Sequence, residues 1–137
     1  MAATADAQKP DQFGFLTGFV VQEFGWDEDV DQALREAIED HTDNELADED
    51  YDGVTDGAIV WWREEDGDLT DTLVDAQTVL EDGGSIWVFN AKPGRDGHIG
   101  HDVIQEAATT AGLHAMSTLS VAPDWTATKL SHRGRGR

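Results

Sequence analysis

The 137-residue chain contains no cysteine, which excludes disulfides, thiolate metal sites and thiol nucleophiles. It has no basic region followed by an apolar run near its start, so it shows no signal peptide. It also has no apolar segment of the ~20 residues that a membrane-spanning helix needs. We therefore expect a cytoplasmic protein with no membrane partner.

Basic residues are scarce, with 9 Lys and Arg against 29 Asp and Glu and a net charge of −20. Binding to nucleic acid or anionic lipid depends on Lys and Arg displacing counterions, so we expect neither partner for the main domain. The charge suits cations, basic partners or solubility alone, and a high-salt host would also account for it. Arg133, Arg135 and Arg137 form a basic tail that is too short to predict RNA contact by itself.

A phosphate-binding turn is also missing. In nucleotide-binding α/β proteins the turn after the first strand is glycine-rich, so that free amides at the helix start hold a phosphate. Residues 19–24 are the first expected strand here, and residues 30–41 the helix after it. The turn between them reads Gly25-Trp26-Asp27-Glu28-Asp29. Its carboxylates repel phosphate, and Asp27 or Asp29 is expected to be the N-cap of the helix, which explains the acidity without a ligand.

Strands and helices alternate along the rest of the chain. Residues 58–63 and 85–90 are apolar on both faces, which is typical of strands in a sheet covered on both sides. Residues 69–80 and 102–111 have helical spacing. Asp68 is the expected N-cap of the first of these helices, and the glycines at 83–84 are expected to end it.

The expected fold class is α/β, a Rossmann-like three-layer sandwich with a mostly parallel sheet. Residues 114–121 and 126–130 are expected to form a C-terminal hairpin that places an antiparallel strand at one edge, and residues 45–48 are a candidate short strand. We expect one domain over residues 13–131, between a disordered leader (1–12) and a flexible basic tail (132–137).

Three segments resemble the actinobacterial domain of unknown function 3052 family over roughly residues 13–130. They are Gly25-Trp26-Asp27-Glu28-Asp29-Val30-Asp31, Val60-Trp61-Trp62-Arg63-Glu64-Glu65-Asp66-Gly67-Asp68-Leu69 and Gly94-Arg95-Asp96-Gly97-His98. The resemblance implies a small cytoplasmic protein with no established activity, and it supplies no catalytic residues.

A second resemblance is carried by Leu80-Glu81-Asp82-Gly83-Gly84-Ser85-Ile86-Trp87-Val88. This segment is similar to the start of a late strand in S-adenosylmethionine-dependent methyltransferases, and the hairpin after Gly112 also suits that fold. Those enzymes carry a Gly-x-Gly turn after the first strand and an acid at the end of the second. The chain lacks the former, so the fold can be shared without the chemistry.

The candidate ligand or partner surface is Trp26, Arg63, Lys92, Arg95 and His98. The last three lie in a loop at the carboxyl end of a central strand, where ligands bind in open α/β sheets. These bases equally balance an acidic neighbourhood. An indole such as Trp26 or Trp125 near a strand end serves as a partner anchor or packs as a lid over the core.

A metal site is a further alternative, carried by His98, His101 and Asp102. Two imidazoles and a carboxylate can ligate zinc, but a third imidazole at fixed spacing is missing. The three residues equally suit a loop and a helix N-cap.

The sequence shows no Gly-x-Ser-x-Gly elbow and no convincing nucleophile–base pair. Our first hypothesis is therefore a non-enzymatic regulatory or accessory protein that acts through an unidentified protein partner and needs no cofactor. The alternative is a small-molecule-binding or degenerate methyltransferase-like protein that uses the strand-end cleft. A deep cleft containing both Arg95 and His98 would favour the alternative.

Overall fold

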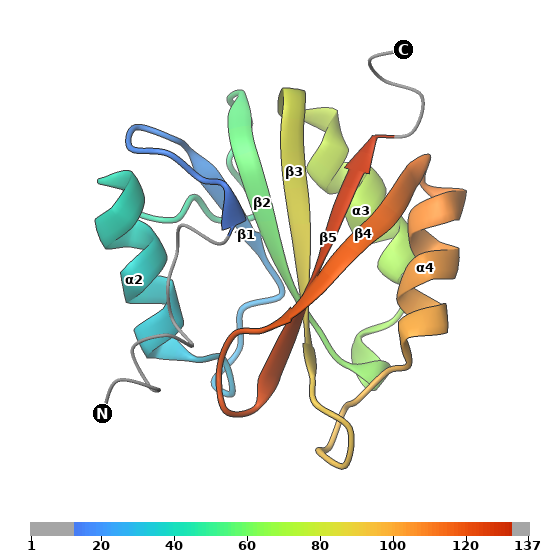
Figure 1. The fold of residues 1–137 in the computed structure, drawn as a ribbon. Coiled ribbons are helices and arrows are strands. Elements are labelled where there is room, and N and C mark those ends of the chain that lie inside the picture. Colours follow the sequence, from blue (N-terminus) through green and yellow to red (C-terminus); the bar gives the residue numbers. More distant parts are fainter. Residues whose placement is uncertain (1–12, 133–137) are drawn as a thin grey trace.

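A computed structural model describes residues 13–132 (Figure 1). The elements are β1 (Val21–Phe24), α2 (Gln32–Thr42), β2 (Thr55–Trp62), the 3₁₀ turn η2 (Glu64–Asp66), α3 (Leu69–Thr78), β3 (Leu80–Ala91), α4 (His101–Thr110), β4 (Leu113–Ser120) and β5 (Trp125–His132). The expected leader, residues 1–12, lies outside the described residues, as do residues 133–137. His132 was expected in the tail, but it is the last residue of β5.

The strands form one sheet in the order β1-β2-β3-β5-β4. β1, β2 and β3 are parallel neighbours, and β5 is antiparallel to both β3 and β4. β5 therefore runs against the other strands, which confirms a mostly parallel sheet with an antiparallel hairpin strand. That strand lies inside the sheet rather than at the edge, because β4 takes the edge position.

Helices cover both faces of the sheet, which confirms the three-layer sandwich (Figure 1). On one face, Leu34 of α2 packs in a cluster with Trp61 and Trp87. On the other face, α3 and α4 pack against Val60 of β2 and Val88 of β3, which neighbour Trp61 and Trp87 in the strands and point to the opposite side. Because both faces are buried, the central strands are continuous apolar runs rather than alternating ones.

Two helix ends differ from the sequence prediction. The N-cap of α2 is Asp31, whose Oδ1 accepts from Leu34 N at 2.9 Å, rather than Asp27 or Asp29. α3 begins as expected, with Asp68 as its N-cap, but it ends at Thr78. The glycines at 83–84 belong to β3 instead, because Leu80 already pairs with Thr55 in the parallel ladder and the strand continues through an irregularity.

The edge strand β4 reads LHAMSTLS and contains no charged residue. Its pairing with β5 is interrupted by a register shift between Ala115 and Thr118. No strand of residues 13–132 pairs with its outer side. None of the helices in this part of the chain has the length and apolarity needed to cross a membrane.

Candidate functional site

Successive segments of the chain are added to opposite sides of β1, so the order of the sheet reverses there. After α2 it returns to Ala47, which forms a parallel bridge to Gln22 on the outer side of β1. The candidate strand at 45–48 is thus a single bridge, held by Glu23 N to Ala47 O at 2.7 Å and Ala47 N to Val21 O at 2.9 Å. The chain then joins the sheet as β2 on the opposite side of β1. In open α/β sheets ligands bind beyond the carboxyl ends of the strands at such a reversal, here between the ends of β1 and β2.

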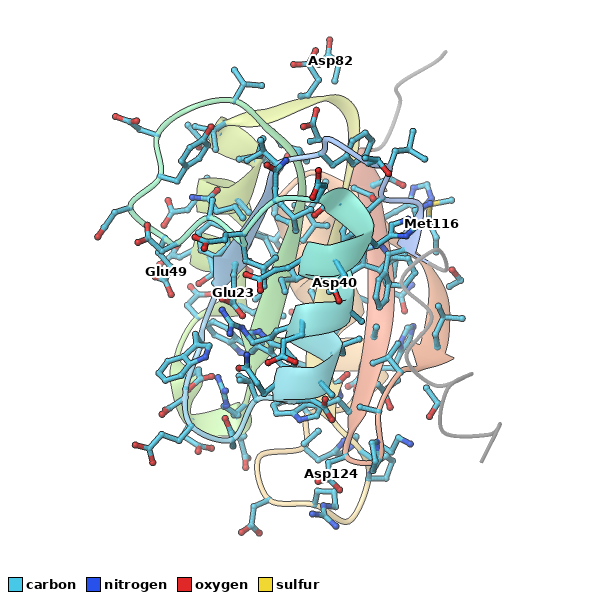
Figure 2. The ribbon with its side chains drawn as sticks, turned by 90° about the vertical axis from the view of Figure 1, so that its left-hand side faces the viewer. Glu23, Asp40, Glu49, Asp82, Met116 and Asp124 are labelled. Atoms are coloured by element: carbon cyan, nitrogen blue, oxygen red, sulfur yellow. The ribbon has the colours of Figure 1, made fainter. Side chains whose placement is uncertain are left out.

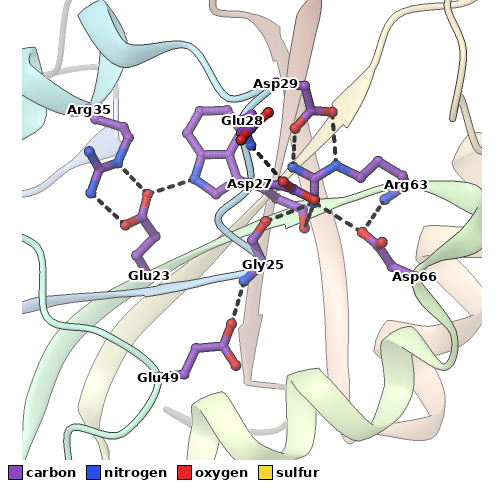
Figure 3. A network of polar contacts seen from close by, with 10 residues as sticks. Glu23, Gly25, Asp27, Glu28, Asp29, Arg35, Glu49, Arg63 and Asp66 are labelled. Atoms are coloured by element: carbon purple, nitrogen blue, oxygen red, sulfur yellow. Dashed lines mark hydrogen bonds and ion pairs between the residues drawn. The ribbon is translucent and has the colours of Figure 1, made fainter.

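The side chain of Arg63, the residue after β2, lies across this crevice and lines the hollow that remains there (Figure 3). Its Nη1 donates to the carbonyl oxygens of Gly25 at 2.7 Å and Trp61 at 3.2 Å, so it joins the ends of the two strands. Asp29 accepts from Nε at 3.0 Å and from Nη2 at 2.5 Å, and Asp66 accepts from Nη1 at 3.0 Å. A buried cation of the protein therefore occupies the position at which a ligand would be expected.

The sequence around Arg63 suits this arrangement. Gly25 has a φ of 77°, and a Cβ at this position would lie 2.2 Å from the carbonyl oxygen of Trp61. Glycine is therefore needed because the turn passes against the backbone of β2, rather than to let a phosphate approach. Asp66, at the end of η2, also accepts from the backbone N of Arg63 at 3.0 Å.

The ion pair between Arg63 and Asp29 shifts the pKa of both groups. Burial by itself lowers the pKa of Arg63, but hydrogen bonds to Asp29 and Asp66 outweigh it and the pKa is raised overall. The hydrogen bond from Arg63 is the largest influence on Asp29, and it lowers the pKa of that carboxyl below its ordinary value of 3.8. The guanidinium and the Asp29 carboxylate are consequently both charged near neutral pH.

A second buried ion pair ties β1 to α2. Glu23 is 6% exposed and accepts from Arg35 Nε at 2.6 Å and Nη2 at 2.8 Å. It also accepts from the indole Nε1 of Trp61 at 2.9 Å, and the hydrogen bond to Glu23 raises the pKa of Arg35. Sequence reasoning missed this pair, although an acid inside an apolar strand is itself a signal that a basic partner is needed.

The structure separates the predicted surface residues. Trp26 is 54% exposed, whereas Arg63 is buried and so is not part of the exposed surface. Arg95 forms an exposed ion pair in which its Nη2 lies 3.0 Å from Oδ1 of Asp124. Arg95 also lines a hollow of about 390 Å³. His98 lines a different hollow, of about 420 Å³, and Lys92 is partly exposed. Arg95 and His98 thus line two different hollows, rather than the one cleft that would have favoured a small ligand.

The candidate metal ligands are not brought together. Within residues 13–132 no three His or acidic side chains are grouped so that they could hold a metal ion. The Nδ1 of His98 lies 2.7 Å from the carbonyl oxygen of Ala91. His101 and Asp102 are exposed residues at the start of α4, whose N-cap is Gly100.

Trp125 differs from Trp26 although both lie near the end of a strand. It is 4% exposed, its ring packs edge-on against Trp61 with centroids 4.9 Å apart, and the guanidinium carbon of Arg63 lies 5.5 Å from its ring. Trp125 is therefore a lid over the core, and Trp26 is the indole of the two that remains exposed.

The chain belongs to the family described as "Protein of unknown function (DUF3052)", whose profile matches residues 10–134. Uncharacterised proteins of Mycobacterium tuberculosis and Mycobacterium bovis are 48% identical to it over 119 residues, which cover 87% of this chain and 75% of each relative. The resemblance predicted from the sequence is thus confirmed.

Several solved methyltransferases share the fold. The glycopeptide N-methyltransferase aligns with a TM-score of 0.63 at 10% identity, over 95% of this chain and 90% of that one. The magnesium protoporphyrin IX methyltransferase of Synechocystis with bound SAM gives 0.60 at 11% identity, over 96% and 78%. The mitomycin 7-O-methyltransferase gives 0.62 at 10% identity, and this chain spans about half of it, 54%. At such identities the likeness shows the Rossmann-like fold alone.

Proposed function

We propose that this protein is a non-enzymatic regulatory or accessory protein that binds a protein partner at the carboxyl edge of its sheet. The observation that supports this most is the position of Arg63. The crevice between the ends of β1 and β2 is the usual ligand position of such a sheet, and here it holds a guanidinium bonded to Gly25, Trp61, Asp29 and Asp66.

The hollows next to Arg63 also disfavour an anionic cofactor. One contains Arg95 together with the carboxylates of Asp29, Asp96 and Asp124. The other contains Arg63 together with Asp27, Glu49 and Asp66. In each hollow the acids outnumber the bases, so a phosphate or carboxylate ligand would be repelled. Trp26 stands at the second hollow as an exposed aromatic anchor of the kind that dominates protein interfaces.

The alternative is a small-molecule-binding or degenerate methyltransferase-like protein. The likeness to a methyltransferase with bound SAM favours it. Titration calorimetry with S-adenosylmethionine and with NAD separates the two. We expect no binding tighter than about 1 mM, because the amide of Gly25 already donates to Glu49 and the acids of the turn disfavour the carboxylate of S-adenosylmethionine and the pyrophosphate of NAD. A micromolar Kd for either ligand would contradict our proposal and support the alternative.

Partner binding is tested with two matched variants. Trp26→Ala and Met116→Ala remove apolar side chains that are 54% and 55% exposed, the first just after β1 and the second within β4. Both should leave the unfolding midpoint nearly unchanged, since neither side chain is buried. Affinity capture from host lysate should lose its specific partner only with Trp26→Ala. If both variants keep every partner, the carboxyl edge is not the interface.

A further inference from the structure

A hollow of about 440 Å³ lies beside β1 on the α3 face of the sheet, and we call it the β1 groove. It is lined by Gln22, Phe24, Glu49, Asp50, Tyr51, Asp52, Thr72, Asp75, Thr78 and Val79. The hollow that contains Trp26 adjoins it, because the two share Phe24, Glu49 and Thr72. The β1 groove therefore opens toward the edge at which we propose partner binding.

The lining of the β1 groove is acidic. Glu49, Asp50, Asp52 and Asp75 are all exposed, and none of the residues that line the groove is basic. A metal ion is not the matching cation, since the described His and acidic side chains form no group that could hold one. An organic cation suits these separated carboxylates better, because it forms one ion pair at a time and needs no closed coordination shell.

Gln22 supplies an observation independent of charge. It is 2% exposed and lies on the same side of β1 as Phe24, which packs with α3. Its Nε2 donates to the carbonyl oxygens of Asp48 and Tyr51, each at 3.1 Å, which orients the amide. Its Oε1 has no hydrogen-bond partner among residues 13–132. A buried amide oxygen that accepts no hydrogen bond is energetically unfavourable. A ligand that donates a hydrogen bond to Gln22 Oε1 would remove this cost.

We propose that the β1 groove binds an arginine side chain on a basic segment of the protein partner, with its guanidinium donating to Gln22 Oε1. This inference rests on the proposed function. Arginine fits better than lysine because its planar fork can donate to the amide and to a carboxylate at once. Exposed aromatic rings border the two hollows, Tyr51 at 38% and Trp26 at 54%, and guanidinium groups stack on such rings.

The binding test uses a fluorescent peptide of alternating Arg and Ala, titrated with the full chain at low salt. We expect saturable binding that weakens as salt screens the charges. The same peptide with citrulline, which keeps the shape of arginine without its charge, should not bind, and the Lys peptide should bind more weakly. Equal binding of the Arg and Lys peptides would contradict the role of the planar fork. Spermine that binds as tightly as the Arg peptide would identify a free amine as the ligand and overturn the proposal.

Charge variants locate the binding. The double variant Asp52→Asn and Asp75→Asn should raise the Kd of the Arg peptide about tenfold, since each removes an exposed ion pair. Asp40→Asn is the control, because Asp40 is an exposed residue of α2 on the other face of the sheet (Figure 2). If Asp40→Asn weakens binding as much as the double variant, the peptide follows the overall field of the protein rather than the groove.

Gln22 is tested by substitution and by spectroscopy. Gln22→Met should raise the Kd about tenfold or more, because a hydrogen bond to a charged group is lost. That variant also loses the two bonds to the 48–51 segment, so the side-chain amide signal of Gln22 in the unaltered protein is followed as well. Addition of the Arg peptide should shift this signal. An unshifted signal during saturable binding would overturn the contact.

The groove proposal and the proposed function fail in different ways. If no Arg peptide binds but Trp26→Ala still abolishes partner capture, the partner uses another chemistry and only the groove proposal is wrong. A tail variant, with Arg133, Arg135 and Arg137 replaced by serine, tests whether the basic end of the chain is the occupant. If the tail variant binds the Arg peptide more tightly but gains nothing once Asp52→Asn and Asp75→Asn are also present, the basic end occupies the groove and the proposal of a partner segment is wrong.

Discussion

Replacing Arg63 with alanine tests whether the crevice is held by an internal ion pair. The side chain of Arg63 is 7% exposed, whereas those of Asp29 and Asp66 are 55% and 28% exposed. Breaking a buried pair costs about 3–5 kcal/mol, and we expect the lower end because water can reach the released carboxylates. A loss of ~3 kcal/mol in unfolding free energy corresponds to a fall of ~10 °C in melting temperature for a domain of this size.

The pH dependence of the same variant is diagnostic. Arg63 holds the pKa of Asp29 below its ordinary value of 3.8 in the folded state. The stabilisation from this pair is therefore fully present above the unfolded-state pKa, and it is lost as the pH falls through the lowered folded-state pKa. The difference between the normal protein and Arg63→Ala should shrink in the same window.

The measurement is urea unfolding of both proteins at a series of pH values from neutral to acid. Arg63→Lys serves as the comparison, because it keeps the charge but cannot donate to Asp29 through two nitrogens; we expect it to lose about half as much stability. A loss below ~1 kcal/mol for Arg63→Ala at neutral pH, or parallel pH profiles, would refute the reasoning.

Three further outcomes are expected. The melting temperature should rise between low salt and about 0.5 M NaCl, because the charge of −20 opposes compaction and salt screens it; a constant or falling midpoint would show that the acids are already well paired. Glu23→Gln should cost ~2 kcal/mol in chemical unfolding, because it breaks a buried pair, whereas the exposed Glu36→Gln should stay within ~0.5 kcal/mol. Gly25→Ala should destabilise far more than Gly112→Ala: both residues have positive φ, but a Cβ at Gly25 would lie 2.2 Å from Trp61 O and one at Gly112 meets nothing within 4 Å. Equal melting temperatures for the two glycine variants would argue against the close approach at β1.

The layered architecture could be predicted because it depends on local patterns. Strands that are apolar on both faces indicate a covered sheet, and the N-cap Asp68 is specified by its immediate neighbours. Sequence reasoning also recognised that the turn at Gly25 would repel an anion. It could not predict that Asp29 pairs with Arg63 instead of capping α2, because the two residues lie 34 positions apart in the sequence.

The candidate site was harder to predict for the same reason. Arg63, Arg95 and Lys92 are alike as sequence, since each follows a strand, and tertiary contacts alone decide which is buried. Trp26 and Trp125 are also alike as sequence. Trp125 is buried because it packs against the ring of Trp61, whereas Trp26 stays exposed. Gln22 carried no signal beyond being polar in an apolar strand, and its unpaired oxygen depends on how the 48–51 segment folds over it.

The uncharged edge of β4 has a consequence for how separate copies of the molecule behave. Exposed sheet edges are usually guarded by lysines or prolines placed on the edge strand, and β4 has neither. Its protection comes from the register shift within it and from the negative field of the whole chain, which keeps two copies apart over ~10 Å at 0.1 M salt. Salt that strengthens the fold by screening repulsion within one molecule also removes the repulsion between two. We therefore expect folding stability and colloidal stability to respond to ionic strength with opposite signs.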